Sequence, residues 1–528
     1  MILLAAGFTT LLLGSATSGV SAQSNKGKAP EPTEVLTEVM APDAEVDRQD
    51  PPVVDTEGQE ARQLRLMEQR ERISGNQPAP APAPEAVASR SRAAAETALA
   101  AETDLNRITK NFRNSVATAR SSTLAEPAAA TDGREVIFTG NTYRSRSTNS
   151  GSTWTDLGAF PAGPADAPFV CCDGDVVHHA GTDTTFDIML YTNAALTNGV
   201  VRIFVRRGLT DTVDCTYTID PGGTANNILP DYPHIATSNS FLYLTSNNIT
   251  NGTTWSGSQV RRFNITQMSN CQSATTNIFT HVGTVGQRVF TPIEGATTEM
   301  FWGSLDSATS FRMFRWPETS TTVTQLTRPV AASAFANPDC RGGTGNFDFV
   351  ERTTSFSIGG FRMRGAKAAN NVMWLWHSSP IGSQTQAHLR GIVIDTTNNA
   401  KVAEPLVFNN SNCIAYPTLG GNSDGEFALS VAFGGNKEVG GTAAQGTVGV
   451  DDSSTAGFSF PWVIVTASGT HNRSDGRYGD YFTVRASKRC SRTWAATNYA
   501  LLNGNTTSAH VNARYVEFQS TTDLVCPA

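Results

Sequence analysis

Short apolar segments separated by turn residues dominate the chain from about residue 120 to its end. Segments such as Phe186–Tyr191, Val200–Val205 and Trp462–Thr466 mix β-branched and aromatic residues and lie close to Gly, Asn, Asp or Ser. No helical periodicity of similar length competes with them. Only 16% of the 528 residues are charged, and glycine occurs 45 times, a composition unfavourable to helices. The pattern predicts an all-β domain.

A rough repeat runs through this domain. Each unit has an acidic or aromatic residue, often followed by proline, then a short apolar stretch, a turn and a strongly apolar strand. The units begin near Glu126, Asp173, Asp231, Pro292, Asn346, Tyr416 and Gly479. Residues 126–528 divide into seven units of about 58 residues, the size of a four-stranded propeller blade with its loops. We therefore expect a seven-bladed β-propeller; six blades fit if the weakest repeat, at Asn346, is an insertion.

The two ends of the domain offer a way to close the ring. A single blade cannot bury both of its faces, so blades stack radially and the first must meet the last. Val511–Phe518 reads as a late strand, and the segment around Phe112–Thr123 is expected to pair beside it.

The residues before the propeller have a different character. Residues 1–22 read as a signal peptide, with an apolar run at 2–13 and small residues at 20–22, although no Lys or Arg precedes the run. Residues 23–119 are rich in Pro, Ala and charge, and lack the apolar surface needed to dock on the propeller. We expect a disordered or partly helical extension there, with Glu57–Ile73 and Ala86–Ile108 as the helical stretches. It is a tether or stalk; the alternative is a propeptide or a partner-binding helix. The propeller then covers residues 120–528.

The cysteines indicate an oxidising compartment. There are eight, and none forms a zinc-finger pattern: Cys171, Cys172, Cys215, Cys271, Cys340, Cys413, Cys490 and Cys526. In an exported chain this count predicts up to four disulfides. The neighbours Cys171 and Cys172 are expected to pair with different partners, and Cys526 with an earlier strand. The alternative is a set of buried free thiols. The expected location is secreted, periplasmic or at the cell surface.

One motif carries a family resemblance. The run Ser147-Thr-Asn149-Ser-Gly151-Ser-Thr-Trp154 resembles the Asp-box of the sialidase-like (BNR) propeller superfamily, with Asn in the acidic place, and the chain looks closest to exported bacterial propellers of that kind. The resemblance implies a structural hairpin turn whose Trp packs between sheets. If the chain were a sialidase, the resemblance would also imply three arginines that bind the substrate carboxylate and a Tyr–Glu nucleophile pair. The family's Arg-Ile-Pro segment is absent here, where Tyr143-Arg144-Ser-Arg146 stands, so sialidase activity is not expected.

The residues that lead the repeats are the candidate site. First strands line the channel of a propeller, so these side chains are expected to converge at one mouth: Glu126, Asp173, Asp175, Asp231, Tyr232, His234, Glu294, Asp348, Tyr416, Asp480 and Tyr481. Such a ring suits sugar hydroxyls, with tyrosine as a stacking face, or Ca²⁺ held by Asp231 and Asp480. No other cofactor is required. An arginine such as Arg477 would compensate crowded carboxylates. The alternative is that the acids cap turns or bond neighbouring blades.

Composition and the missing motifs limit the function. A net charge of −7 does not suit nucleic-acid binding, and no apolar run after residue 22 could cross a membrane. Because no complete catalytic constellation is visible, the sequence favours an extracytoplasmic binding or surface-interaction module for polysaccharides or glycoprotein glycans. The alternative is a carbohydrate-active enzyme, a glycoside hydrolase or polysaccharide lyase working in the channel. A carboxylate pair at glycosidase spacing would favour the enzyme.

Overall fold

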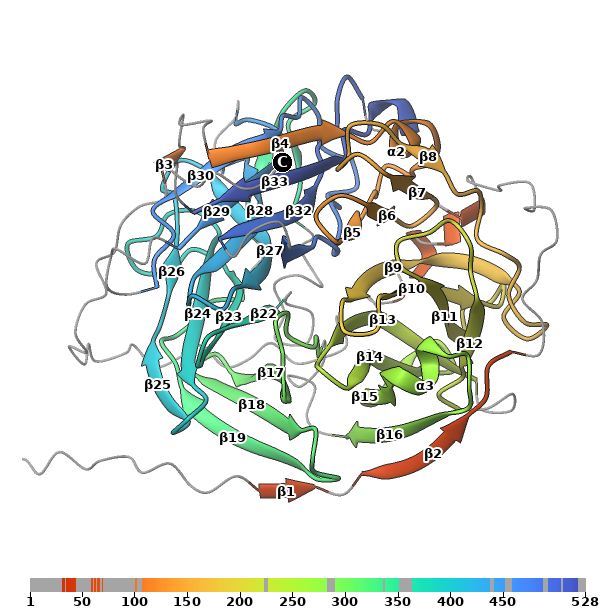
Figure 1. Ribbon diagram of the computed structural model, residues 1–528. Helices are drawn as coiled ribbons and strands as arrows, with labels where there is room; N and C mark the ends of the chain where they lie inside the picture. The colour runs from red at the N-terminus through yellow and green to blue at the C-terminus, as the bar shows by residue number, and fades with distance from the viewer. Residues whose placement is uncertain are drawn as a thin grey trace, which may run out of the picture.

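Seven β-sheet blades surround a central axis in the computed structural model of the protein (Figure 1). The seven-bladed propeller predicted from the repeat is therefore confirmed. The structure describes residues 31–33, 35–43, 58, 59, 61, 62, 64–66, 69, 100, 101, 107–222, 227–282, 290–335, 338–350, 363–436, 441–451, 458–487, 492–504 and 507–520. The expected signal peptide, residues 1–22, lies outside them.

Each of the first three blades has its strands in chain order from the axis outward. Blade 1 consists of β5 (Ala128–Thr131), β6 (Val136–Thr139), β7 (Arg144–Ser147) and β8 (Thr155–Asp156). Blade 2 consists of β9 (Phe169–His179), β10 (Thr184–Thr192), β11 (Gly199–Arg207) and β12 (Cys215–Ile219). Blade 3 consists of β13 (Ile228–Thr237), β14 (Phe241–Thr250), β15 (Thr254–Asn264) and β16 (Ala274–His281), with β2 (Leu36–Met40) added outside.

The other four blades follow the same plan. Blade 4 consists of β17 (Glu299–Ser307), β18 (Ser310–Pro317) and β19 (Val323–Pro329), with β1 (Glu31–Thr33) outside. Blade 5 consists of β22 (Met363–Ala368), β23 (Asn371–Ser378), β24 (His388–Asp395), β25 (Ala400–Ala403) and β26 (Leu406–Val407). Blade 6 consists of β27 (Cys413–Gly421), β28 (Phe427–Gly434), β29 (Gln445–Val450) and β30 (Trp462–Ala467), with β3 (Ala100–Ala101) outside. Blade 7 consists of β31 (Val484–Ala486), β32 (Thr493–Asn498), β33 (Arg514–Gln519) and β4 (Ile108–Arg113).

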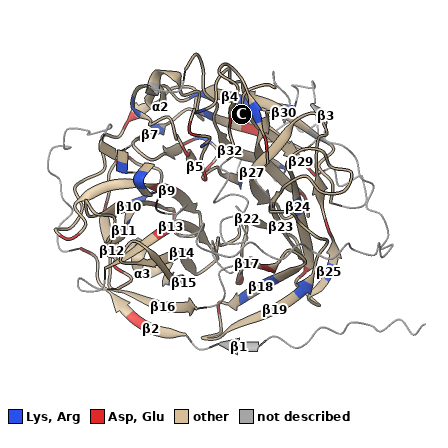
Figure 2. Ribbon diagram, turned by 180° about the vertical axis from the view of Figure 1, so that it is seen from behind, with Lys and Arg blue, Asp and Glu red and all other residues tan. Residues whose placement is uncertain are grey.

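The short helices lie in the connections: α2 (Ser115–Arg120), α3 (Ile265–Ser269) and the 3₁₀ turn η3 (Ser508–His510). Asn114 caps α2, since its side chain accepts from the N–H groups of Val116 and Ala117. No helix within the described residues has the length and hydrophobicity that a membrane crossing requires. Acidic and basic residues are spread around the ring and are not gathered on one blade (Figure 2).

The ring closes as the sequence predicted. Strand β4 pairs antiparallel with β33, and Phe112 lies opposite Tyr515. Lys110 of β4 contacts Glu517 of β33 across this pair at 3.1 Å, and the carboxylate of Glu517 is almost fully buried. The first blade thus meets the last through a strand from the N-terminal side of the propeller.

The described parts of residues 23–119 are attached to the ring. Strands β1 and β2 extend blades 4 and 3 by antiparallel pairing, and Leu66 is fully buried in the core of blades 2 and 3. The prediction that this stretch lacks the apolar surface to dock is therefore wrong for these residues. The error has a local cause. Leu64, Leu66 and Met67 stand among charged residues and give no wide apolar face, yet Leu66 fills a site that the propeller provides.

The fifth repeat does not begin at Asn346. Residues 341–348 form a two-stranded hairpin, β20 (Arg341–Gly342) and β21 (Phe347–Asp348), and the first described strand of blade 5 is β22, from Met363. The blade count was right because one blade does lie in this interval. Its start was misplaced because the hairpin imitates the acidic–aromatic beginning of a unit.

Three disulfides join described cysteines. Cys215 pairs with Cys271, Cys340 with Cys413, and Cys171 with its neighbour Cys172. The prediction that Cys171 and Cys172 have different partners is wrong. Both lie on β9, where the strand passes through a bulge and the two side chains meet within the core. Cys490 and Cys526 lie outside the described residues.

The Asp-box-like run forms the turn between β7 and β8. The hydroxyl of Ser147 accepts from the N–H of Gly151, and the side-chain oxygen of Asn149 accepts from the N–H of Thr153. Gly151 has φ +88°, and a Cβ there would lie 2.6 Å from the ring of Tyr515. Trp154 packs edge-on against Phe138. These residues tie and pack a turn, which is the structural role expected for them.

Candidate functional site

A bulge interrupts the inner strand of three blades at the residues that lead the repeats. The ladder register shifts at Asp173 on β9, at Tyr232 on β13 and at Tyr416 on β27. These three residues have φ values of +63°, +57° and +54°, and each is followed by Gly or Pro. Left-handed backbone at non-glycine residues is costly and persists only where the surroundings hold it.

Side chains from neighbouring blades hold these bulges. Asn141 of blade 1 accepts from the N–H of Asp173, and Asp173 in turn accepts from the N–H of Tyr232. Glu126 accepts from the N–H of Asp480 and from the side-chain amide of Asn141. We call Glu126, Asn141 and Asp173 the cap network. Two of the predicted acids thus have the alternative role foreseen for them, which is to bond neighbouring blades.

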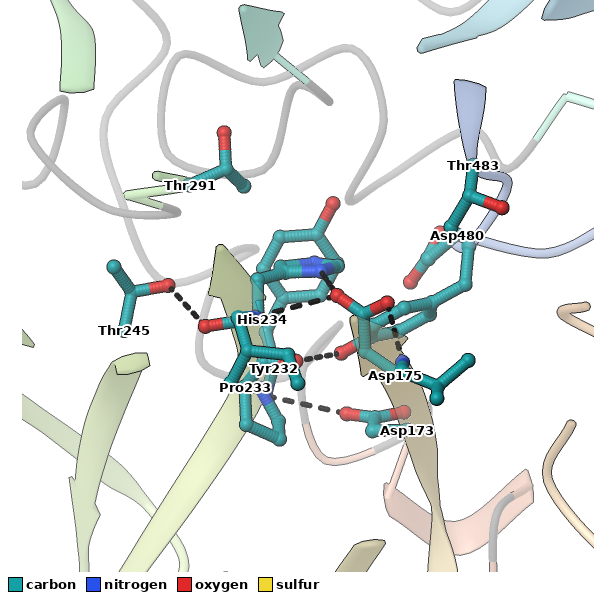
Figure 3. Close-up of polar contacts among 12 residues, drawn as sticks. Asp173, Asp175, Tyr232, Pro233, His234, Thr245, Thr291, Asp480 and Thr483 are labelled. Carbon is teal, nitrogen blue, oxygen red and sulfur yellow. Dashed lines mark hydrogen bonds and ion pairs between the residues drawn. The ribbon is translucent and has the colours of Figure 1, made fainter. Parts of the chain in front are cut away.

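Beyond the bulges, residues far apart in sequence, among them Asp175, His234 and Asp480, lie close together (Figure 3). The ring centroid of His234 lies 4.4 Å from that of Tyr232 and 4.2 Å from that of Tyr481. The hydroxyl of Tyr481 donates to the carbonyl of Pro233 at 2.9 Å. Blades 3 and 7 therefore meet here, as expected if the residues that lead the repeats point toward the channel. Tyr232 is 2% exposed and Tyr481 0%, so neither ring has an open face for a sugar.

Two carboxylates share one guanidinium beside these rings. A single nitrogen of Arg485, Nη2, lies 3.2 Å from Asp175 Oδ1 and 2.9 Å from Glu294 Oε1. Both oxygens contact the same nitrogen, so the distance between these two oxygens is at most about 6 Å. Arg485 also donates to the carbonyl of Ala129 in blade 1.

A second arginine, Arg364 of β22, completes the group. Its Nη1 lies 2.8 Å from His234 Nδ1, and its Nη2 donates to the carbonyl of Asp480 at 3.3 Å. His234 Nδ1 lies 3.7 Å from Asp175 Oδ2. We call Asp175, His234, Glu294, Arg364 and Arg485 the charged cluster. Five different blades supply its five members, and a sixth, blade 1, supplies the carbonyl of Ala129 as a partner.

Glu294 is fixed by its own backbone. Its N–H donates to the carbonyl of Gly365, and its carbonyl accepts from the N–H of Lys367, so the inner segment of blade 4 bonds directly to β22 of blade 5. Gly295 has φ +78°, and a Cβ there would lie 2.7 Å from the carbonyl oxygen of Lys367. Only glycine allows this approach, which directs the Glu294 side chain toward Arg485.

The environments of the two carboxylates move their pKa values apart. Burial raises the pKa of Glu294 to about 7; Asp175 adds to the rise, while Arg485 and Arg364 oppose it. Burial alone would also raise the pKa of Asp175, but Arg485, His234 and Arg364 together lower it to about 2. The Glu294 side chain keeps 20% of its surface exposed, whereas Asp175 keeps 5%. At neutral pH Asp175 is ionised, and a large fraction of Glu294 carries a proton that solvent can reach.

Other predicted residues lie apart from this cluster. Asp348 sits in the β20–β21 hairpin and accepts from the N–H groups of Cys340 and Val350. Tyr416 is buried, and its N–H donates to His377. Asp231 is buried on β13 opposite Asn247. Within the described ranges, no three His, Cys, Asp or Glu side chains are grouped as metal ligands.

The two arginines of the cluster were missed by the sequence reasoning. Arg364 follows directly after Met363, so a correct start of the fifth repeat would have placed it on an inner strand. Arg485 lies four positions after Tyr481, within the inner strand of blade 7. Arg477, the cation proposed to compensate the acids, donates to the carbonyl of Leu64, and its charge helps to lower the pKa of Asp475.

Comparisons with known proteins give only distant likenesses. Neither a protein-family model nor a curated protein sequence matches the chain. Among solved structures, the α-L-arabinanase of Penicillium chrysogenum complexed with arabinobiose is 9% identical, with a TM-score of 0.37 over 79% of this chain and 100% of that one. The α-L-arabinofuranosidase Arb93A of Fusarium graminearum is 7% identical, with a TM-score of 0.38 over 78% and 98%. The Trypanosoma rangeli sialidase is 9% identical, with a TM-score of 0.33 over 59% and 53%. Likeness this weak implies nothing about the activity of this chain.

Proposed function

We propose that the protein is an exported glycoside hydrolase whose site is the charged cluster at the centre of the ring. The observation that supports this is the pair Asp175 and Glu294, which share Arg485 but have pKa values of about 2 and about 7. Two neighbouring carboxyl groups with separated pKa values suit the two roles of glycoside hydrolysis. The substrate class is polysaccharide or glycoprotein glycan, outside the cytoplasm.

Glu294 is the proton donor in this proposal. Its protonated carboxyl group gives its proton to the glycosidic oxygen as the bond from that oxygen to the anomeric carbon breaks. Asp175 remains ionised, and its charge stabilises the oxocarbenium-like transition state. Water then adds to the anomeric carbon and returns a proton to Glu294. Arg485 positions both carboxylates and takes no part in proton transfer.

The binding-module alternative has less support from the geometry. It relied on tyrosines as stacking faces for sugars, yet Tyr232, Tyr416 and Tyr481 are each at most 3% exposed. Glu294, by contrast, is accessible to solvent and is held in a state that a purely structural acid does not require. Membership of the Asp-box propellers and export by a signal peptide belong to the same proposal, and the three disulfides support export.

The test is hydrolysis of a panel of neutral polysaccharides and 4-nitrophenyl glycosides by the full chain. Replacing the proton donor, Glu294→Gln, should lower kcat on polysaccharide by about 10²–10⁴-fold. The loss should be smaller on 4-nitrophenyl glycosides, whose leaving group needs less protonation. In the wild type, kcat should fall as the pH rises through about 7, because Glu294 then loses its proton.

Glu299→Gln is the matched control. Glu299 lies in the same blade, contacts an arginine (Arg315) and has 21% of its side chain exposed, so its loss should leave kcat unchanged. Saturable glycan binding without hydrolysis, unaffected by Glu294→Gln, would show that the protein is a binding module. Equal loss of activity on both substrate types would remove Glu294 from the role of proton donor.

A further inference from the structure

Three buried arginines outside the charged cluster lie where blade 1 packs on blade 2, its neighbour in the ring (Figure 1). Strand β7 of blade 1 supplies Arg144, and β11 of blade 2 supplies Arg202 and Arg206. Each of the three is at most 7% exposed. Residues two apart on a strand face the same side, so Arg202 and Arg206 share one face of β11 with Phe204 between them. Since a guanidinium keeps its proton in proteins, three positive charges are buried in this region.

Two of these arginines have an acidic partner, and the third differs from them. Arg206 Nη2 lies 3.1 Å from Asp187 Oδ2, in a pair that is almost fully buried. Arg202 Nη2 lies 3.3 Å from Asp43 Oδ2. Among the residues that the structure describes, no carboxylate lies within ion-pair distance of Arg144, and the negative charge of Asp187 acts on it only from farther away. The charge of Arg144 is therefore the one that this set of side chains leaves without a direct counter-charge.

The guanidinium of Arg144 is also only partly hydrogen-bonded. Its Nη2 donates to the carbonyl of Ala159 at 2.8 Å. Its Nε and Nη1 are buried and have no hydrogen-bond partner within the described part of the chain. The ring centroids of Phe160 and Phe204 lie 4.4 and 5.5 Å from its Cζ. The two rings attract the cation, but they cannot replace the acceptors that Nε and Nη1 would have in water.

A buried charge of this kind is costly unless something balances it, because buried ions in proteins are ordinarily paired. Burial and the positive charge of Arg206 lower the pKa of Arg144 to about 10, while Asp187 opposes the fall. Arg144 is therefore still a cation at neutral pH. Arg146, two positions along the same strand, shows the ordinary arrangement: its Nη2 lies 3.1 Å from Glu135 Oε1, and 21% of its side chain is exposed.

We propose that Arg144 binds a small monovalent anion of the chloride class between blades 1 and 2, through its Nε and Nη1. The aromatic rings and the buried carboxylate of Asp187 disfavour a multiply charged oxyanion, whose dehydration would cost more. For the same reason bromide, which is weakly hydrated, should bind better than fluoride. The ion would join the two blades, because its donors come from β7 and the ring of Phe204 comes from β11. This inference does not depend on the proposed hydrolase function.

Thermal unfolding of the full chain in sodium bromide and in sodium fluoride, at equal ionic strength and pH 7, tests the site in solution. An ion that binds only the folded state raises the midpoint by mass action. The bromide midpoint minus the fluoride midpoint should therefore be about 2 °C or more higher in the wild type than in Arg144→Met. General salt effects cancel in this comparison, since they act alike on both proteins. Arg146→Met is the matched control and should behave as the wild type, because Arg146 already has Glu135.

Bromide-soaked crystals of the wild type give a second measurement, which decides by itself if Arg144→Met does not fold. Anomalous diffraction at the bromine edge should place an ion against Nε or Nη1 of Arg144. A water molecule there, without anomalous signal, would overturn the proposal, because water satisfies a donor but leaves the charge unbalanced. Equal bromide-minus-fluoride differences in all three proteins would overturn it as well. A crystal peak combined with equal differences in solution would mean an adventitious ion only, and would also count against the site.

Discussion

Asp173 and Asp175 stand two positions apart on β9, and they belong to two different parts of the channel. Asp173 is in the cap network, where it accepts from a backbone N–H of blade 3. Asp175 is in the charged cluster, where it faces Arg485 and His234. The bulge between them places one carboxylate in each network.

The two positions show that neighbouring residues of one inner strand can have different roles, one in holding the backbone and one in a cluster of charges. In the cap network, acids and amides hold left-handed backbone, and their partners are neutral backbone groups or the neutral side-chain amide of Asn141. In the charged cluster, charges from several blades meet, and two carboxylates compete for Arg485. A raised pKa at Glu294 means that its charged form is disfavoured by the fold, which is a cost that the cap network does not carry. In the charged cluster, the property of Glu294 that suits the proposed function therefore lowers the stability of the fold.

Asp175→Ala should have the largest effect on folding. It leaves the buried guanidinium of Arg485 without one partner and the N–H of Ile235 without its acceptor. We expect a loss of about 3–5 kcal/mol of unfolding free energy, measured by urea denaturation at pH 7. Asp424→Ala, which removes a half-exposed partner of Arg492, should cost less than about 1 kcal/mol. Similar losses in the two variants would mean that the ion pairs of the charged cluster contribute no more to stability than a half-exposed ion pair does.

Asn141→Ala tests the cap network and should have a smaller effect. The variant removes the acceptor for the N–H of Asp173 and a donor to Glu126, at a cost of about 1–3 kcal/mol. Because Glu294 is untouched, Asn141→Ala should cost the same amount in the wild type and in the Glu294→Gln background at pH 7. A different loss in the two backgrounds would show that the two networks are coupled.

Calcium should have the smallest effect. Binding by Asp231 and Asp480 stays a prediction of the sequence, but Arg364 and Arg485 already supply positive charge at the centre of the channel. We expect millimolar calcium and chelator to give midpoints of thermal unfolding within about 1 °C of each other, in the wild type and in Asp480→Asn. Stabilisation by calcium that Asp480→Asn abolishes would establish the cation site.

The sequence predicted the fold better than the site. Patterns that recur in every unit predicted the number of blades and most of the repeat starts. They also predicted that the segment at Phe112 closes the ring. The misplaced start at Asn346 and the bond between Cys171 and Cys172 depend on single local features, a hairpin and a bulge, which no repeat reinforces.

The site was predicted only in part for a similar reason. Asp175, His234 and Glu294 were found because they lie near the starts of repeats. Arg364 and Arg485 were not, because a pairing between blades depends on the three-dimensional approach of strands that are distant in sequence. The docking of Leu66 was missed for the same reason.

The titration of Glu294 through the pH dependence of stability tests the central claim most directly, because it needs no substrate. The unfolding free energies of the wild type and of Glu294→Gln would be compared from pH 4 to pH 9. With a pKa of about 7 in the folded chain and an ordinary value of 4.5, the folded state binds more protons across this window, so wild-type stability should fall as the pH rises. The difference in unfolding free energy between Glu294→Gln and the wild type should be constant below pH 4.5. It should then shift by about 3 kcal/mol in favour of Glu294→Gln by pH 7, and level off above that pH. Parallel curves would show that Glu294 has an ordinary pKa, and would contradict its role as the proton donor.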